Sequence, residues 1–589
     1  MRTLGVSFGY HDATAALVAG DRLWMASEER YSRLKHDPNL PRRSIAACLG
    51  AAGMTAGELD AVVYYEEPHA KFARVLVSTL AAFPWSAGRF AKSARDWVGE
   101  RLWSVEQLAI ALDLPASRVQ TAAHHQSHAA QAFLGSPFSE AAILTLDAVG
   151  EWTCTSIARG HADGRVEVLA SWDYPHSLGL FYAAFTGFLG FRPNDGECST
   201  MALARFGQPT RADDVRRVLQ VSPAGDYALA DGFLDLTAET VPYTRRFLDL
   251  FGEPRDPRRP LPFDALGDET APPDARRWAD LAASVQLVLE EAVLALARRA
   301  KRETGLDRLC LAGGVALNCV ANARLCREGP FTEIYIPPDP GDGGAAFGAA
   351  MTGHKSRVAY TPFCGPTVDT GPALDLLPHL DVHEWTGGTR GDEVRLHVER
   401  PAHPETLVAR VVERLGQGEV VGWFQGGMES GPRALGQRSI LFDPRRVDLA
   451  RRVSTEVKAR APFRPYALSV AEDDAAELLE GASPLRGWMQ VAAPVRDPAR
   501  VRAGVHIDGT TRPQVCRRDE NPLYHDLLRA WVAESGAPAL LNTSMNGRGH
   551  PIVDGPFEAL AFFARSRLDC LVLGDTILHK TPPTGAPHG

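Results

Sequence analysis

Residues 142–169, AILTLDAVGEWTCTSIARGHADGRVEVL, decide the fold because they repeat the pattern of residues 4–24, LGVSFGYHDATAALVAGDRLW. In each stretch an apolar strand meets a small polar turn, a second strand follows, and a turn containing glycine leads into a third strand. Helical sequence follows each copy. We therefore expect an α/β protein in which two related lobes face each other across a cleft.

Composition limits the class of protein. The chain has 589 residues, too many for one core, and its 45% hydrophobic and 23% charged residues are typical of a soluble multidomain protein. We find no apolar run long enough to span a bilayer, and the N-terminus is interpreted as a strand rather than a signal peptide. The nine cysteines form no CxxC pair, which indicates reduced thiols. We expect a cytoplasmic protein with no membrane partner.

The charge and a boundary segment add two expectations. The net charge of −9 argues against a nucleic-acid backbone as the main binding partner. Small anions are still possible ligands. A segment rich in Pro, Gly and Thr, from about residue 360, marks a domain boundary. We assign residues 1–370 and 371–578 to two domains and 579–589 to a disordered tail.

Residues 274–305 predict one long amphipathic helix, acidic at its start and basic at its end.

The stretch HHQSHAAQAF raises the question of a metal site. On a helix His124 and His128 share a face, while His125 points about 100° away. The pair alone is ambiguous between a surface or core role and a metal site. Asp147 at a strand end and Asp342 at the start of a Gly-rich helix add carboxylates, although Asp342 has the alternative role of a helix N-cap. Two histidines with carboxylates suit Fe(II), Zn(II) or Mn(II).

Two turns carry further candidates. Gly313 and Gly314 end an apolar strand just before a helix, so their N–H groups are open to an anion or nucleotide. This signal is weak by itself. His11 and Asp12 lie at the turn of the first hairpin, where they fit either a general base with its partner or ordinary turn chemistry.

The densest group of basic residues lies in GWFQGGMESGPRALGQRSILFDPR and EVKARAPFRPYALS. Guanidinium groups bind phosphate bidentately and lysine adds a compact charge, while the alternative is a solvated basic face. Further on, DGTTRPQV adds an arginine. The strand end LLNTSMNG adds amide and hydroxyl groups that suit a small planar group, with turn chemistry as the alternative. The candidates are Arg433, Arg438, Lys458, Arg464, Arg512, Asn542 and Ser544.

Nine stretches of the chain match motifs of one family in the same order. They are YHDATAAL, ASEERYSRLKHD, HHQSHAAQAF, LDAVGEW, LAGGVALNCVANARL, PPDPGDGGAAFGAA, GPRALGQRSIL, VKARAPFRPYA and LLNTSMNGRGHPIV. The chain thus resembles the NodU/CmcH-type O-carbamoyltransferases from residue 9 to about residue 554. The resemblance implies an N-terminal two-lobed fold of the actin/Hsp70-like (ASKHA) kind and a C-terminal YrdC-like α/β domain.

The resemblance also implies the chemistry. Members of the family use carbamoyl phosphate and ATP, pass through carbamoyl-adenylate, and transfer the carbamoyl group to an alcohol with release of AMP. The acceptor would be a small molecule such as a specialised metabolite or antibiotic, with no nucleic acid involved. Domain 1–370 would hold the metal and nucleotide, with Mg²⁺ compatible with ATP, and domain 371–578 would hold carbamoyl phosphate. A homodimer is compatible with the sequence.

Site residues follow from the resemblance position by position. The metal, Fe(II) before Zn or Mn, would be held by His124, His128, Asp147 and Asp342, and His11 would deprotonate the acceptor hydroxyl. The nucleotide would contact Asp12, Gly150, Gly313, Gly314 and Asn318. Carbamoyl phosphate would be bound by Arg433, Arg438, Lys458, Arg464, Arg512 and Ser544. Asn542 would be a further ligand-binding residue.

One stretch departs from the family pattern. Members commonly carry a sequence like GEYKVMGLAPYG, where this chain has GECSTMALARFG, so Ser199 replaces a lysine and Ala202 replaces a glycine. Loss of that positive charge is expected to weaken the binding of a nucleotide phosphate, unless Arg205 in the next turn compensates for it. A nucleotide-binding regulator without activity, and threonylcarbamoyl transfer to tRNA, are the alternatives.

Overall fold

The computed structural model describes residues 1–81, 87–238, 242–259, 261–262, 272–354, 356–386, 389–460, 466–481, 483 and 487–581. The chain forms two compact units. The first consists of Met1–Met25 and Pro38–Tyr360, and the second of Ala26–Asp37 and Thr361–Gly589. The predicted N-terminal domain ran unbroken from residue 1 to 370, whereas the structure assigns Ala26–Asp37 to the second unit.

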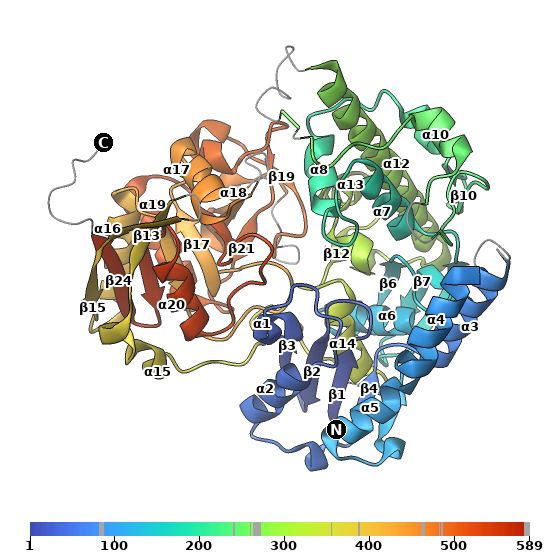
Figure 1. Ribbon diagram of the computed structural model, residues 1–589, viewed down its shortest axis with the longest axis horizontal. Helices are drawn as coiled ribbons and strands as arrows, with labels where there is room; N and C mark the ends of the chain where they lie inside the picture. Colours follow the sequence, from blue (N-terminus) through green and yellow to red (C-terminus); the bar gives the residue numbers. More distant parts are fainter. Residues whose placement is uncertain are drawn as a thin grey trace. The chain divides into compact units, whose positions relative to one another are not determined.

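The first unit contains two five-stranded sheets of the same topology (Figure 1). In each, an antiparallel hairpin is extended by two parallel strands, and the strand order is third, second, first, fourth, fifth. The first sheet holds β1 (Arg2–Ser7), β2 (Thr14–Ala19), β3 (Arg22–Ser27), β4 (Ala61–Tyr64) and β5 (Val119–Thr121). The second holds β6 (Ala141–Leu146), β7 (Thr153–Gly160), β8 (Val166–Asp173), β11 (Arg308–Ala312) and β12 (Glu333–Tyr335).

This repeated topology confirms the duplicated hairpin predicted from residues 4–24 and 142–169, and with it the actin/Hsp70-like fold class. The strands β1, β2 and β6 are buried nearly throughout, which explains their unbroken apolar sequences. Helices cover both sheets, as the fold requires.

The helices of the first unit include the long one predicted over residues 274–305. It is α12 (Pro273–Thr304), with Asp274 in its first turn, Lys301 and Arg302 in its last, and Gly305 in the left-handed conformation as its cap. The other elements are α2 (Arg42–Ala52), α3 (Pro68–Ala81), α4 (Ala87–Gly99), α5 (Ser104–Leu112), α6 (His124–Leu134), α7 (Leu178–Phe188), α8 (Glu197–Ala204), α9 (Ala212–Arg216), β9 (Leu219–Val221), β10 (Tyr227–Leu229), α10 (Arg245–Phe251), α13 (Cys319–Glu328) and α14 (Asp342–Met351).

Helices α6 and α14 pack at very short range, which is what positions the candidate site. A Cβ added at Gly348 of α14 would lie 1.7 Å from the backbone oxygen of Ser127 on α6. The sequence DGGAAFGAAM therefore has small residues because two helix backbones meet there. As a result, the first residue of α14 lies beside the histidine-bearing face of α6.

The second unit is built on one mixed eight-stranded sheet, the α/β domain predicted to be YrdC-like. Its order is β15-β24-β23-β16-β17-β22-β18-β21. The strands are β15 (Arg395–Glu399), β16 (Val421–Phe424), β17 (Arg438–Phe442), β18 (Ala467–Ala471), β21 (Gln514–Cys516), β22 (Leu540–Ser544), β23 (Cys570–Leu573) and β24 (Thr576–Thr581). Small two-stranded sheets are formed by β13 (His383–Thr386) with β14 (Thr389–Glu393) and by β19 (Ala493–Pro494) with β20 (Thr510–Thr511).

Side chains alternate between the two faces of this sheet. Trp423 packs with the apolar faces of α16 (Pro404–Gly416) and α19 (Pro522–Ser535), whereas its neighbour Phe424 belongs to the core on the other face, with α20 (Pro556–Ala564). The remaining helices are α1 (Glu28–Ser32), α15 (Gly371–Leu374), α17 (Val447–Arg452) and α18 (Ala475–Leu478). The first residues of the predicted tail 579–589 are part of strand β24, and the rest of that tail lies outside the described residues.

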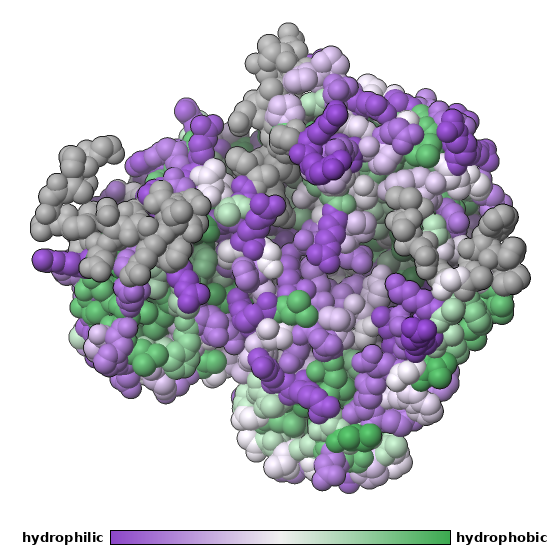
Figure 2. Space-filling view, viewed as in Figure 1, coloured by the Kyte–Doolittle hydropathy of each residue, from purple (hydrophilic) through white to green (hydrophobic). Residues whose placement is uncertain are grey.

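No helix among the described residues is both long enough and apolar enough to cross a membrane. On the face drawn in Figure 2, hydrophilic and hydrophobic residues are interspersed.

Candidate active site

The first unit brings His124 and His128 together with two carboxylates. Both histidines lie on α6 and are at most 1% exposed, and Glu151 accepts the backbone N–H of His124 at 3.0 Å at the start of the helix. Asp147 directly follows β6 and Asp342 is the first residue of α14. One ligand atom from each of the four residues lies within 4.8 Å of all the others.

The four side chains face a common point. Nε2 of His124 lies 2.8 Å from Oδ2 of Asp147, and Nε2 of His128 lies 3.4 Å from the same oxygen. Oδ1 of Asp342 lies 3.3 Å from His128 and 3.7 Å from His124. The predicted ligand set is therefore one buried cluster, although the residues come from three separate parts of the chain.

The charges in this cluster perturb each other strongly. Burial by itself lowers the pKa of His128, but the adjacent carboxylates of Asp147 and Asp342 outweigh it and raise the pKa to about 10. Burial raises the pKa of both carboxyl groups, yet the neighbouring histidines bring the pKa of Asp147 and of Asp342 below the ordinary value. Two buried carboxylates thus require positive charge at their centre.

The donor set fits a divalent metal ion. Within the described part of the chain, Nε2 of His128 is buried and has no hydrogen-bond partner, although two carboxylate oxygens are close. Two imidazole nitrogens and two carboxylate oxygens suit Fe(II), Zn(II) or Mn(II). His125, in contrast, turns its Nδ1 to the hydroxyl of Thr145 at 2.6 Å, away from the cluster.

Neighbouring backbone groups orient Asp147 and His124. The N–H of Gly314 donates to Oδ1 of Asp147 at 2.9 Å, which directs the other oxygen toward the histidines. Gly313 takes a φ of 91°, and a Cβ there would lie 2.2 Å from the oxygen of Leu146. A Cβ at Gly150 would lie 2.9 Å from that of His124. In the structure, these three glycines fit closely around the cluster, and their contact with a nucleotide stays a prediction.

His11 lies next to the cluster. Its Nε2 is 3.8 Å from Oδ2 of Asp342 and its Nδ1 is 2.9 Å from Oδ2 of Asp12. Burial lowers the pKa of His11, but the carboxylates of Asp342 and Asp12 outweigh it and raise the pKa to about 9. The ring is 27% exposed, so solvent or a small molecule reaches it more readily than the four buried residues of the cluster. Asp12 has a φ of 52°, consistent with turn chemistry as well.

Asn318 lies in the turn before α13 and is occupied by structural bonds. Its Oδ1 accepts the backbone N–H of Ala321, which makes it the N-cap of the helix, and its amide also pairs with Gln286. These bonds explain its burial without a nucleotide.

Sequence reasoning missed two acids beside the cluster. Glu151 accepts N–H groups of His124 and Glu67, and Glu66 lies 3.9 Å from Nδ1 of His124. Glu151 was visible in the motif LDAVGEW, four residues after Asp147, but it contacts the start of a helix that precedes it in the chain. That contact is tertiary, so no local pattern reveals it.

In the second unit, Lys458 and Ser544 come together. Nζ of Lys458 is buried and lies 3.1 Å from Oγ of Ser544, which ends β22, and it also pairs with Asn546. Asn542, on the same strand, donates to the backbone oxygen of Ala434 at 3.1 Å, in the loop between β16 and β17. The end of β22 thus adjoins the loop that carries Arg433.

The same loop is fixed by a buried acid that sequence reasoning missed. Oε1 of Glu429 accepts the N–H groups of Leu435, Gln437 and Arg438 at 2.8 to 3.0 Å. Gln514, two residues after Arg512, donates to the oxygen of Leu435. Arg433 and Arg512, both partly buried, therefore belong to the same loop and strand group.

Arg438 has a structural role in the same loop. It is fully buried, its guanidinium stacks 3.6 Å from the centre of the Phe424 ring, and it donates to backbone oxygens of Gln425, Gly426 and Asp554 among others. Burial lowers its pKa to about 10. A guanidinium occupied in this way holds the loop together, and its contact with carbamoyl phosphate stays a prediction. Arg464 lies outside the described residues.

The duplicated sheets and the buried cluster define the class: an actin/Hsp70-like α/β protein with a two-histidine, two-aspartate centre, joined to a second α/β domain. Residues 2–351 match the family model "Carbamoyltransferase N-terminus" and residues 412–580 match "Carbamoyltransferase C-terminus". The chain belongs to the carbamoyltransferase family, as its motifs predicted.

Two of the following three relatives span most of the chain. An uncharacterised protein of Synechocystis is 38% identical over 98% of this chain and 96% of its own length. Nodulation protein NolNO of Sinorhizobium fredii is 33% identical over 97% of this chain and 79% of its own. A 3'-hydroxymethylcephem-O-carbamoyltransferase of Amycolatopsis lactamdurans is 30% identical over 46% of this chain and 48% of its own.

Proposed function

We propose that the protein is an O-carbamoyltransferase that uses carbamoyl phosphate and ATP, through carbamoyl-adenylate, to carbamoylate a hydroxyl group of a small molecule. The observation that carries the proposal is the buried cluster of His124, His128, Asp147 and Asp342 with His11 beside it, in a member of the carbamoyltransferase family. A relative whose name states its acceptor chemistry, the 3'-hydroxymethylcephem-O-carbamoyltransferase, supports transfer to oxygen.

In the transfer step the acceptor oxygen bonds to the carbamoyl carbon and the bond from that carbon to AMP breaks, so AMP leaves. In its neutral form, with the proton on Nδ1 directed at Asp12, His11 takes the hydroxyl proton at Nε2; positive charge bound by Asp342 would favour that form. The four-residue cluster would hold a divalent metal, which would supply positive charge to offset a phosphate. Burial of the cluster keeps water from the reactive intermediate.

In the second unit, we propose that Lys458, Ser544, Arg433, Asn542 and Arg512 line the carbamoyl phosphate site. A buried ammonium beside a hydroxyl suits one phosphate oxygen, and arginines from the loop and strand suit the others. Lys458 is held in place by Ser544 and Asn546, so its charge is positioned at the end of β22.

The proposal is tested by following AMP and a carbamate ester in reactions with carbamoyl phosphate, ATP and a panel of alcohols. We expect AMP in the wild type and a rise of about tenfold in the KM for carbamoyl phosphate in Lys458→Met, because one charge-assisted bond is lost. Lys92→Met, an exposed lysine on α4, is the control and should match the wild type. Absence of AMP with every acceptor would instead favour a nucleotide-binding regulator.

A further inference from the structure

Each histidine of the cluster has a second ring nitrogen that does not face the aspartates. Nε2 of both rings faces Asp147 and Asp342, so a metal held there would be bound at Nε2. The ring hydrogen then lies on Nδ1, because a neutral imidazole carries one N–H. The group that Nδ1 faces therefore fixes the orientation of the ring and the strength of the ligand.

Gln131 fixes the hydrogen on the ring of His128. Its amide nitrogen donates to the backbone oxygen of Asp339. Because a carbonyl oxygen only accepts, the amide oxygen of Gln131 is the atom that faces His128, and it lies 3.3 Å from Nδ1. Nδ1 is thus the donor in this contact, and Nε2 is left to the cluster.

The corresponding neighbour of His124 is a carboxylate. Nδ1 of His124 is buried and makes no hydrogen bond within the residues that the structure describes, and Oε2 of Glu66 lies 3.9 Å from it. With a metal at Nε2 the ring hydrogen lies on Nδ1, where Glu66 is placed to accept it. A shift of about 1 Å brings the two atoms into hydrogen-bonding range.

Glu66 is held from two sides. Its Oε1 accepts the hydroxyl of Tyr64 at 3.1 Å, and its Oε2 pairs with the ammonium group of Lys71, in the first turn of α3. Both members of this ion pair are buried. Because a carboxylate oxygen accepts two hydrogen bonds, Oε2 can take the imidazole N–H in addition to the lysine.

The two histidines therefore differ in the group behind them. His128 donates to a neutral amide, whereas His124 faces a carboxylate. A carboxylate acceptor makes an imidazole more basic, and so a stronger metal ligand, than an amide does. His124 is thus expected to be the stronger of the two nitrogen ligands.

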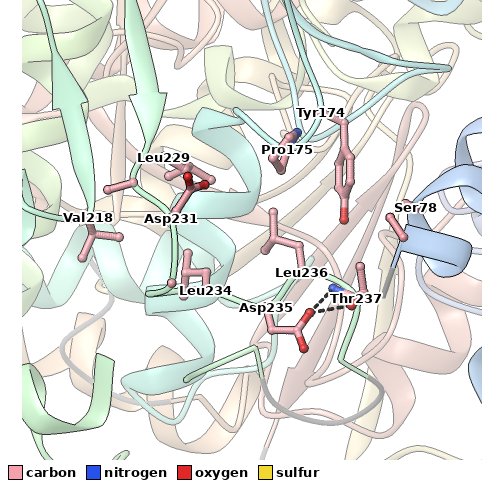
Figure 3. Close-up of a pocket in the computed structure, with 13 residues that line it drawn as sticks. Ser78, Tyr174, Pro175, Val218, Leu229, Asp231, Leu234, Asp235, Leu236 and Thr237 are labelled. Carbon is pink, nitrogen blue, oxygen red and sulfur yellow. Dashed lines mark hydrogen bonds between the residues drawn. The ribbon is translucent and has the colours of Figure 1, made fainter. Parts of the chain in front are cut away.

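Helix α3 also contributes to a separate feature of the first unit. Ser78, near the end of the helix, lines a cavity of about 330 Å³ together with Tyr174 and Leu229 (Figure 3). Among the described residues that line this cavity none is a histidine, and neither Lys71 nor Glu66 belongs to it. A change at Ser78 is therefore a control for effects that α3 transmits in general.

We propose that Glu66 is a positioning residue of the metal centre. It accepts the Nδ1 hydrogen of His124, holds the ring with Nε2 toward the cluster and strengthens that nitrogen as a ligand, while Lys71 balances its charge. The inference rests on the metal site of the proposed function and assigns a role to two residues that the proposed function does not use.

Metal binding by the full chain, without ATP, carbamoyl phosphate or an acceptor, tests the proposal. Competition with a chromophoric chelator measures the affinity for Zn(II), and the visible absorption of bound Co(II) reports on the ligands. We expect Glu66→Gln to weaken Zn(II) binding by about ten- to hundredfold and to shift the Co(II) absorption, because the charge behind His124 is lost. Ser78→Ala and Glu67→Gln, an exposed neighbouring carboxylate, are the controls and should match the wild type.

Variants of Lys71 separate a role at the metal from a role in stability. Lys71→Met keeps the carboxylate and leaves its charge uncompensated, which favours a cation nearby, so Zn(II) affinity should be unchanged or higher. Glu66→Gln/Lys71→Met removes both charges of the buried pair together, so it should fold as stably as the wild type and still bind Zn(II) as weakly as Glu66→Gln. Chemical denaturation without metal checks the folding of each variant.

Wild-type affinity and an unchanged Co(II) absorption in Glu66→Gln overturn the proposal. Equal weakening in Glu66→Gln and Lys71→Met overturns it too, because the ion pair would then act on stability alone. Formation of AMP is followed separately. Metal binding that depends on Glu66, in a protein that forms no AMP, supports this inference and overturns the proposed function, whereas normal AMP formation with metal binding independent of Glu66 overturns this inference alone.

Discussion

Single residues at the candidate site are held by contacts that reach far along the chain. His124 and His128 lie one turn apart on the same face of one helix. The carboxylate oxygens that they face belong to Asp147 and Asp342, in other parts of the chain. Each carboxylate begins or ends a regular element, which fixes its backbone, and Gly314 fixes the rotation of Asp147. At this scale two buried cations differ in their partners: Lys458 donates to the backbone oxygen and hydroxyl of Ser544 and to Asn546, whereas Arg438 donates to backbone oxygens alone.

The ligand assignment predicts metal loss in single variants. His128→Ala and Asp342→Asn should each lower metal affinity by about ten- to hundredfold, because each removes one donor from a buried four-donor set. Metal per chain after dialysis, measured by inductively coupled plasma mass spectrometry, checks this. His125→Asn on the same helix is the control, since His125 contacts Thr145 and not the cluster. Unchanged metal content in both ligand variants would show that the cluster is not a metal site.

At the scale of elements, the site depends on how closely α14 and α6 pack. The small residues of α14 let Asp342 reach the histidine face of α6, and the glycine turn after β11 lets Gly314 reach Asp147. These contacts explain why DGGAAFGAAM and GGVALN are rich in small residues. In the sequence both stretches were candidates for ligand binding, whereas in the structure each also serves close packing of backbone.

Gly348→Ala should therefore be strongly destabilising. A Cβ at this position would lie 1.7 Å from a backbone oxygen, so the helices must separate, and we expect the free energy of unfolding to fall by about 3 kcal/mol. Gly50→Ala on α2 is the matched control, because nothing lies within 4 Å of its added Cβ, and it should be neutral or stabilising by about 0.5–1 kcal/mol. Chemical denaturation compares the two. Equal stability of both variants would contradict the tight packing of α6 and α14.

At the scale of the whole molecule, the chain enters its second unit twice. Ala26–Asp37 leaves the first unit and belongs with Thr361–Gly589. In that unit, Arg30 donates to the oxygen of Gly431 at 3.0 Å, and Arg33 donates to the oxygens of Pro551 and Ile552. The N-terminal segment thus supports the loop that carries Arg433, and the motif ASEERYSRLKHD is explained by this structural role.

Arg30→Met should loosen that loop without disturbing the first unit. Arg30 is 1% exposed, so its loss leaves buried carbonyl groups without a donor, at a cost of about 1–3 kcal/mol. Hydrogen-exchange mass spectrometry should show faster exchange in residues 425–437, with β1 and β6 unchanged. The exposed Arg42→Met on α2 serves as the control. Slow exchange in 425–437 despite the loss of Arg30 would argue against a structural role for this segment.

The sequence by itself determined the duplicated sheets, the long helix α12, the family and the residue types of the cluster. These depend on local periodicity, turn residues and helix ends, which short stretches of sequence record. Only the tertiary structure decided that Ala26–Asp37 belongs to the second unit and that Arg438 is occupied by backbone oxygens. Such features arise from contacts between residues hundreds of positions apart, where burial decides whether a charge is satisfied or exposed to a ligand.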